Sequence, residues 1–216
     1  MLRWYPYRFE FFFFSFLVIL FGSLLVPTVL FEQVISPDLF NINILAGILL
    51  LFNKKFLMWF VIILLVISAI AFGLDLTQLE DNYTFGILKM ASYFLFYIIV
   101  TTELISQVWK SKIVNRPIIF GLISGYISLG LIGFFIFLSI ELLYPNSFSG
   151  FVPEISNNEN LMYHSLITLF TIGHGDIIPV TIIAQKSSIL IGLMGQVYLV
   201  VITSIVVGKY IKQNGN

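Results

Sequence analysis

Six apolar stretches with few charges constrain the fold of this chain more than any other feature. They occupy residues 11–31, 39–52, 56–74, 85–109, 117–144 and 181–207. A helix rises about 1.5 Å per residue, so about 20 residues cross a bilayer, and only the stretch at 39–52 is short for this task. Charged residues make up 10% of the chain, whereas soluble proteins carry roughly a quarter. We therefore expect an all-α integral membrane protein.

Basic residues gather at both ends of the chain and after the second and fourth stretches. These residues are Arg3, Arg8, Lys54, Lys55, Lys110, Lys112, Arg116, Lys209 and Lys212. The four places share one side of a membrane only if the short second stretch also crosses. The positive-inside rule then predicts six crossings with both termini in the cytoplasm. Most acidic residues fall on the outer side, and Lys89 and Lys186 do not fit the pattern. The outer acidic set is Glu32, Asp38, Asp75, Glu80, Asp81, Glu154, Glu159 and Asp176.

The charge balance and the cysteine count exclude several kinds of function. Eleven basic and 11 acidic residues give a net charge of zero, so no nucleic-acid partner is expected. The absence of cysteine excludes disulfides, thiolate catalysis and cysteine-ligated metals. The first stretch is too long for the apolar part of a signal peptide, and we interpret it as an uncleaved span. A glycosylation sequon begins at Asn82 on the predicted outer side, but such triplets often occur by chance.

A short segment between the last two apolar stretches places glycine and polar residues at membrane depth. Asn158 or Asn160 can cap a helix of roughly ten residues, which is too short to cross a bilayer. The TIGHG sequence that follows must lie inside protein or line an aqueous cavity, because lipid cannot satisfy non-helical backbone. Gly173 and Gly175 can adopt left-handed angles, which lets successive carbonyls point the same way. A row of carbonyls is a cation site.

The TIGHGD sequence at 171–176 resembles the T-V-G-Y-G-D signature of tetrameric potassium channels. The longer SLITLFTIGHGDIIPVT and the later GLMGQ are similar to bacterial channels built as helix, pore helix, filter and helix, over residues 117–209. In that family four identical chains surround one pore, and filter carbonyls replace the water shell of a potassium ion. The resemblance implies a homotetramer in a bacterial inner membrane. Its partners would be membrane lipids and the permeant K⁺, with no further cofactor.

The resemblance also implies two domains, a four-helix domain at 1–116 and a pore domain at 117–212. The expected parts of the pore domain are an outer helix at 117–144, a pore helix at 160–170, a filter at 171–176 and an inner helix at 181–208. The first four stretches match only a six-helix architecture. The fourth carries Lys89 and Glu103 instead of regularly spaced arginines, so we expect no voltage gating of the usual kind. Glu103 could pair with Lys110, with Lys112 or with another span.

The resemblance assigns ion-binding roles to the filter residues. Thr171 would contribute its hydroxyl and carbonyl, Ile172, Gly173 and His174 would contribute carbonyls, and Gly175 would permit the geometry at the outer mouth. His174 replaces the usual tyrosine or phenylalanine, and Phe170 replaces a second threonine that is common in the family.

Two pairs would support the filter, one at its outer mouth and one behind it. A family spacing of 13 residues joins Tyr163 to Asp176, although an exposed Asp176 would also attract cations. A second spacing places His164 opposite His174, within one chain or between neighbours. Because imidazole titrates near pH 6.5, we hypothesise that mild external acid loosens or closes the filter. The alternative is that each histidine merely packs and bonds to backbone or water.

The inner helix carries a candidate hinge and a candidate cavity lining. Gly195 lies where the family often places a hinge glycine, although close packing of helices is an equally good reason for it. Polar and apolar residues on one helical face would line the cavity, unless the polar ones simply bond to neighbouring helices. This face comprises Gln196, Leu199, Thr203 and Val207, with Val207 narrowing the inner end.

Three other functions compete with a potassium channel. A non-selective cation channel would follow if His174 loosens the filter, and a non-conducting accessory subunit would follow if the filter cannot form. The Gly-His-Gly-Asp sequence also satisfies the G-x-G-D pattern of intramembrane aspartyl proteases. That chemistry needs two carboxylates inside the membrane, and Asp176 has no such partner because Asp38, Asp75 and Asp81 lie at predicted outer edges.

Overall fold

The computed structural model describes residues 5–27, 30–31, 35–76 and 83–214, which are mostly helical. The expected outer-side residues Glu32, Glu80 and Asp81 and the sequon at Asn82 lie outside the described residues. The elements in chain order are η1 (Tyr5–Tyr7), α1 (Arg8–Phe21), η2 (Gly22–Leu24), α3 (Ser36–Leu50), α4 (Lys55–Leu76), α5 (Tyr83–Lys110), α6 (Arg116–Leu143), β1 (Phe148–Ser149), α7 (Asn157–Leu169), β2 (Ile178–Pro179), α8 (Ile182–Val197), η4 (Tyr198–Ile202) and α9 (Thr203–Asn214).

Four helical segments in the described part of the chain are long and apolar enough to cross a membrane. They are Tyr5–Leu24, Gly86–Lys110, Arg116–Leu143 and Ile182–Gln213, and the apolar helices Ser36–Leu50 and Lys55–Ile70 are shorter. The expectation of an all-α protein with apolar, membrane-crossing helices is confirmed at this level. The six crossings stay a prediction.

The chain forms two compact units. Unit 1 comprises Met1–Lys110 and Asn115–Ser124, and unit 2 comprises Ser111–Val114 and Gly125–Asn216. The boundary therefore falls inside α6, a helix that contributes to both units. The functional division predicted at residues 116 and 117 stays a prediction.

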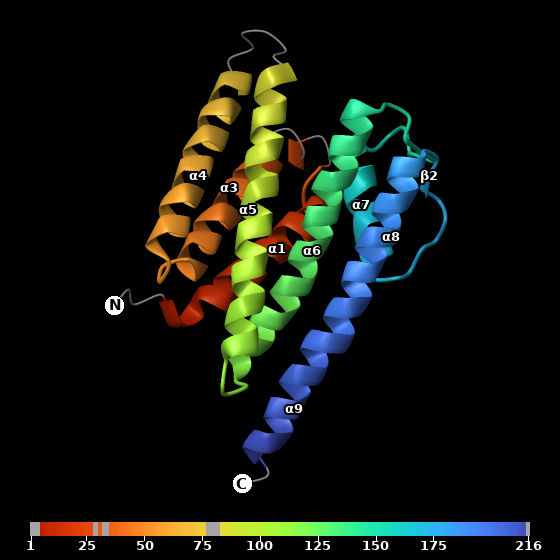
Figure 1. The fold of residues 1–216 in the computed structure, drawn as a ribbon. Helices are drawn as coiled ribbons and strands as arrows, with labels where there is room; N and C mark the ends of the chain where they lie inside the picture. The colour runs from red at the N-terminus through yellow and green to blue at the C-terminus, as the bar shows by residue number, and fades with distance from the viewer. Residues whose placement is uncertain (1–4, 28–29, 32–34, 77–82, 215–216) are drawn as a thin grey trace. The chain divides into compact units, whose positions relative to one another are not determined.

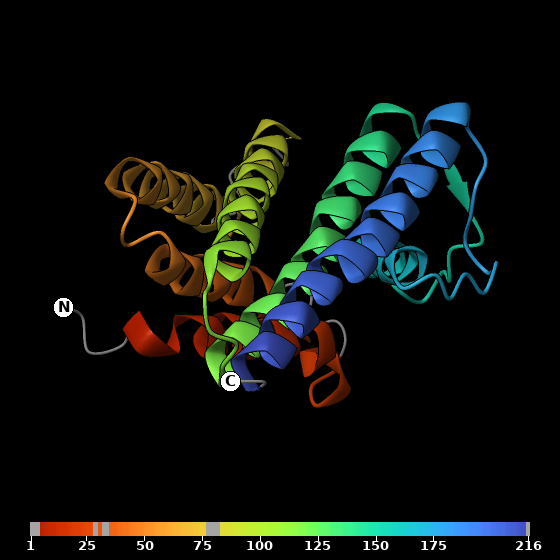
Figure 2. The same ribbon diagram turned by 60° about the horizontal axis from the view of Figure 1, so that its bottom comes forward.

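Unit 1 is a helical bundle in which α1 packs against α3, α3 packs against α4 and α5, and α4 packs against α5 (Figures 1 and 2). Its core is aromatic: Phe12, Phe16, Phe96 and Tyr97 are fully buried, and the Phe16 and Tyr97 rings stack with centroids 6.0 Å apart. Several polar groups in this core are paired, whereas the buried Glu10 Oε2 and Ser124 Oγ atoms have no hydrogen-bond partner among the described residues. The Asn43 amide donates to the Ser15 hydroxyl (2.7 Å) and accepts from the Tyr97 hydroxyl (3.0 Å). Such pairing stabilises the bundle because lipid offers no replacement partner.

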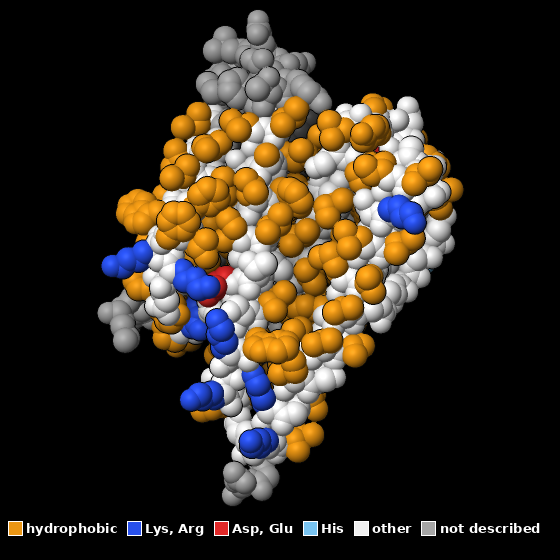
Figure 3. Space-filling view, viewed as in Figure 1, with side chains coloured by type: hydrophobic (Ala, Val, Ile, Leu, Met, Phe, Trp, Pro, Cys, Tyr) orange, Lys and Arg blue, Asp and Glu red, His pale blue; other side chains and the backbone are white. Residues whose placement is uncertain are grey.

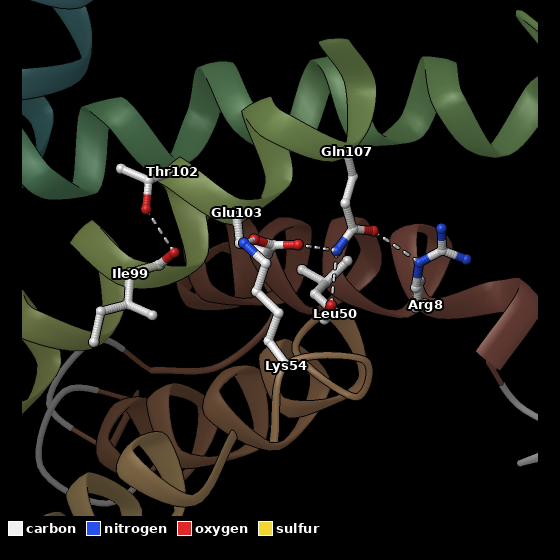
Figure 4. A network of polar contacts seen from close by, with 7 residues as sticks. All are labelled: Arg8, Leu50, Lys54, Ile99, Thr102, Glu103 and Gln107. Carbon is white, nitrogen blue, oxygen red and sulfur yellow. Dashed lines mark hydrogen bonds and ion pairs between the residues drawn. The ribbon is translucent and has the colours of Figure 1, made fainter. Parts of the chain in front are cut away.

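A polar network ties several elements of unit 1 together at one end (Figure 4). The Lys54 ammonium lies 2.5 Å from the carboxylate of Glu103, and the Gln107 amide donates to Glu103 (3.0 Å) and to the Leu50 carbonyl (2.7 Å). Arg8 donates to Gln107 in turn (3.1 Å). The pairing of Glu103 with Lys110 or Lys112 that the sequence allowed is not formed; Glu103 instead binds a lysine beyond the end of α3.

The surface of unit 1 matches a membrane setting. Figure 3 shows hydrophobic side chains over the visible face of α4 and α5 and basic side chains near the end of α5. Phe56 and Trp59 on α4 are 83% and 61% exposed. Large exposed apolar faces of this kind are rare in soluble monomers and are typical of surfaces that meet lipid or other protein.

Within unit 2, α7 packs against α8 and against the second half of α6, with α6 and α8 running side by side (Figures 1 and 2). The first residues of α6 and α8 lie within one residue of the helix starts expected at 117 and 181. The predicted inner helix is not continuous α-helix, because a five-residue π-helix, η4, separates α8 from α9.

Candidate functional site

The short helix α7 begins at a cap different from the expected one. Ser156 has extended backbone angles and its hydroxyl accepts the N–H of Glu159 (3.2 Å), so Ser156 is the N-cap. The prediction of Asn158 or Asn160 was therefore wrong. Asn160 is buried and binds the preceding loop instead: its side chain accepts the N–H of Val152 and donates to that residue's carbonyl, both at 3.2 Å. The capping preferences of the residues do not predict this contact, because it joins the helix to a separate loop.

Small residues on α6 and α8 bring α7 close to both helices. The Ser165 hydroxyl donates to the Gly130 carbonyl (2.6 Å). A Cβ at Gly133 would collide with the Ser165 side chain, and a Cβ at Gly195 would collide with the Leu169 carbonyl oxygen. Glycine therefore permits close approach at these positions, as small residues commonly do between membrane helices. The sequence left two roles open for Gly195, a hinge and close helix packing, and the structure favours close packing.

The segment after α7 alternates between left-handed and other backbone angles. Thr171, Gly173 and Gly175 have φ values of 57°, 57° and 79°, while Ile172 and His174 do not have positive φ. Alternation of this kind lets successive carbonyls point the same way. The N–H groups of Ile172 and Gly173 both reach the carbonyl oxygen of Ile167, at 2.8 and 3.3 Å. The end of α7 thus holds the N–H groups of Ile172 and Gly173 on one side of the chain.

All residues from Thr171 to Asp176 are exposed in the single chain. The Thr171 hydroxyl donates to the Phe170 carbonyl (2.7 Å), and the Gln196 amide approaches Thr171 at 3.4 Å. Gln196 therefore lies beside the start of the TIGHGD segment.

The hydrogen bond expected between Tyr163 and Asp176 is present. The phenol oxygen lies 2.6 Å from the Asp176 carboxylate, and the Ile177 N–H donates to the other carboxylate oxygen (2.9 Å). The Tyr163 hydrogen bond lowers the pKa of Asp176 below its usual value. Asp176 thus remains an anion at physiological pH. Its contribution to ion entry stays a prediction.

The two histidines lie in different environments. His164 is 5% exposed, and its ring lies 5.2 Å from Phe137 and 5.5 Å from Phe148, measured between centroids. Neither ring nitrogen of His164 has a hydrogen-bond partner among the described residues. His174 is exposed. The expected bond between the two histidines is therefore not formed within one chain, and its form between neighbouring chains stays a prediction. Burial lowers the pKa of His164, and the Asp176 carboxylate acts in the opposite direction.

The candidate cavity face is interrupted by the π-helix. Gln196 precedes it, Leu199 lies inside it, and Thr203 and Val207 follow it. Gln196, Leu199 and Val207 are exposed, while Thr203 is half-buried. The role of these four residues in lining a cavity stays a prediction.

Three residues that shape this region escaped the sequence analysis. The Glu141 carboxylate accepts the N–H groups of Asn146 (2.7 Å), Ser147 (3.0 Å) and Phe148 (3.2 Å), which folds the chain back after α6. The sequence pattern that could have predicted this role of Glu141 is an acidic residue near the end of an apolar stretch, four positions before PNS. Gly150 has φ 88° and packs on the Asp176 carbonyl, and the Tyr126 hydroxyl donates to the Leu169 carbonyl (3.0 Å). Nothing in the local sequence marks Tyr126.

The comparison with known protein families gives one match. The model of an ion channel family matches residues 121–212, which is less than half of the chain and includes α7, the TIGHGD segment and α8. No curated protein and no protein of solved structure matches the chain. The match and the apolar helices together indicate an integral membrane ion channel, not an intramembrane protease or another enzyme.

Proposed function

We propose that four copies of this chain form a potassium-selective channel that conducts K⁺ passively across the membrane. In this proposal α6 and α8–α9 are the outer and inner helices, α7 is a re-entrant pore helix, and residues 171–176 are the filter. Carbonyls of Thr171, Ile172, Gly173 and His174 replace the hydration shell of the ion, and Gly175 shapes the outer mouth.

The observation that carries the proposal is the alternating backbone from Thr171 to Gly175. A β-branched residue at positive φ is unfavourable, yet Thr171 has a φ of 57°. The bonds from Ile172 and Gly173 to the Ile167 carbonyl hold this strained geometry in place. Strain of this kind is found where function needs a particular backbone geometry, and a row of aligned carbonyls is the arrangement that binds dehydrated alkali cations.

Charge at the outer end supports cation entry. Asp176 directly follows the alternating segment and is ionised at physiological pH, and the hydrogen bond from Tyr163 lowers its pKa further. Four such carboxylates around one axis would raise the local concentration of cations.

The proposed gating excludes a voltage sensor of the usual kind. A sensor needs several charges that move through the membrane field, at about 2.3 kcal/mol per charge per 100 mV. In α5, Glu103 is paired with Lys54, so the pair carries little net charge. We place both termini in the cytoplasm, with six crossings in a bacterial inner membrane, as the distribution of basic residues indicates.

External pH is the proposed modulator. Protonation of His164 would place a charge between Phe137 and Phe148, where neither ring nitrogen has a partner within the described chain. Because burial lowers the pKa of His164, its protonation needs an external pH below the ordinary imidazole value of about 6.5. Currents that stay constant from neutral to acidic external pH would remove this part of the proposal.

The test is ion flux in liposomes that contain the purified full chain, with K⁺ on one side and Na⁺ on the other. Wild-type protein should give a reversal potential near that of K⁺. Gly173→Ala should abolish selective flux, because alanine resists a φ of 57°. Gly86→Ala is the matched control, since a Cβ there also meets nothing within 4 Å and no left-handed angle is required. Equal selective flux from both variants would refute the filter assignment.

A non-selective cation channel is the second candidate. It is favoured by one observation, the lack of a hydrogen-bond partner for the ring nitrogens of His164 within the described chain, which leaves the filter with less support from behind. A reversal potential near zero in the same assay would favour this function over potassium selectivity. Absence of any flux would favour a non-conducting subunit.

A further inference from the structure

The carbonyl of Leu169 is held from outside its own helix. The last carbonyls of an α-helix have no partner within the helix and must find one elsewhere. In α7, the Ile167 carbonyl accepts from Ile172 and Gly173, and the Thr168 carbonyl accepts from Thr171. The Leu169 carbonyl instead accepts the hydroxyl of Tyr126, which lies 43 positions earlier on α6 (3.0 Å).

Tyr126 also connects this carbonyl to the inner helix. Its ring stacks on Tyr198, with centroids 5.6 Å apart and planes at 25°, and lies 5.4 Å from the Phe170 ring. Gly195, one turn before Tyr198 on α8, approaches the same Leu169 carbonyl closely enough to exclude a Cβ. The end of α7 is therefore held between Tyr126 on one side and α8 on the other.

Only Phe170 separates this held carbonyl from Thr171, the first residue of the proposed filter. The Thr171 hydroxyl donates to the Phe170 carbonyl (2.7 Å), so a displacement of the peptide after Leu169 passes directly to Thr171. A binding site loses specificity when its ligands move by about 0.5 Å, so a single hydrogen bond at this point can affect ion discrimination.

We propose that Tyr126 is a positioning residue for ion selectivity, acting through the Leu169 carbonyl and the stack on Tyr198. The inference rests on the proposed potassium-channel function. A tyrosine in a membrane helix also bonds to a carbonyl for purely structural reasons, since its hydroxyl needs some partner. The two roles differ in what they change: a structural bond affects stability alone, whereas a positioning bond changes the ratio of Na⁺ to K⁺ permeability.

The test is the reversal potential of Tyr126→Phe in full-length tetramers, reconstituted with K⁺ on one side and Na⁺ on the other. This variant keeps the ring and its stack and removes only the hydroxyl. We expect the Na⁺ to K⁺ permeability ratio to rise about fivefold, which corresponds to about 1 kcal/mol at 1.4 kcal/mol per factor of ten. Tyr144→Phe, on an exposed tyrosine just beyond α6, is the matched control and should keep the wild-type ratio.

A second pair of variants separates the stack from the hydrogen bond. Tyr198→Leu removes the stack but leaves the Tyr126 hydroxyl, and it should raise the permeability ratio, whereas Tyr198→Phe should not. An unchanged ratio in folded, tetrameric Tyr126→Phe would overturn the inference while leaving the potassium channel intact. Wild-type protein without selective K⁺ flux would overturn the proposed function, and the inference with it.

Discussion

Gly195 is the position at which packing and hinge motion make opposite predictions. A Cβ at this position would collide with the backbone carbonyl of Leu169 and lie 3.1 Å from the Leu169 side chain. The carbonyl cannot swing away as the end of a flexible side chain could, because it belongs to the end of α7 and accepts the Tyr126 hydroxyl. Gly195→Ala must therefore displace α7 from α8.

The expected change in the free energy of unfolding of Gly195→Ala follows from two opposing contributions. Alanine in place of a helix-interior glycine contributes up to about 1 kcal/mol of stability. Overpacking of a close contact costs about 1–3 kcal/mol. Gly208→Ala in α9 isolates the first term, because a Cβ there meets nothing within 4 Å. The propensity term cancels between the two variants, so Gly195→Ala should be about 1–3 kcal/mol less stable than Gly208→Ala.

The assay is denaturant unfolding of the purified protein in detergent, followed by helical circular dichroism. The free energy of unfolding is compared among wild type, Gly195→Ala and Gly208→Ala. If Gly195 were only a hinge, both alanines would stabilise the protein equally and Gly195→Ala would reduce channel opening alone. Equal free energies of unfolding for the two variants would therefore refute the packing argument.

Two further predictions concern charged groups, one in each unit. Tyr163→Phe removes the hydrogen bond that lowers the pKa of Asp176, so the part of the acid-induced loss of K⁺ conductance that lies below the His164 titration should shift to a higher external pH than in wild type. The sign follows because a depressed carboxyl pKa preserves the anion until the pH falls through that lower value; an unshifted titration would contradict it. Lys54→Met leaves the 9% exposed Glu103 carboxylate without its cation and should lower the free energy of unfolding by about 2 kcal/mol. Lys55→Met is the neighbouring control, and a cost equal to that of Lys54→Met would show that the ion pair contributes nothing.

Features that depend on local composition were predictable from the sequence. The starts of α6 and α8 lie within one residue of the expected ones, since apolar runs and their flanking residues mark helices directly. Gly173 and Gly175 were expected to adopt left-handed angles, and both do. The hydrogen bond between Tyr163 and Asp176 was implied by the family resemblance, in which the two positions are 13 residues apart.

Features that depend on contacts between distant residues were not predictable. Ser156 and Asn160 can both cap a helix, and the loop contact of Asn160 with Val152 decides between them. The partner of Glu103 lies 49 positions away rather than on its own helix. Thr171 would not be assigned a positive φ from its residue type, because the bonds that hold this angle come from the next two residues and the end of α7.

The π-helix η4 has the widest consequence for the inner helix. The sequence YLVVI carries no local signal for it, yet a π-turn adds one residue relative to regular α-helix. One residue corresponds to a rotation of about 100°, so residues beyond η4 that continue the face of Gln196 are displaced by one position. The displaced positions are Ser204 and Gly208 in place of Thr203 and Val207. Ser204 is exposed whereas Thr203 is half-buried, so exposure favours Ser204 over Thr203 as the residue on this face. Val207 and Gly208 are both exposed, so exposure does not distinguish between them. A glycine at the inner end would leave the cavity wider than the valine that regular helical spacing places there.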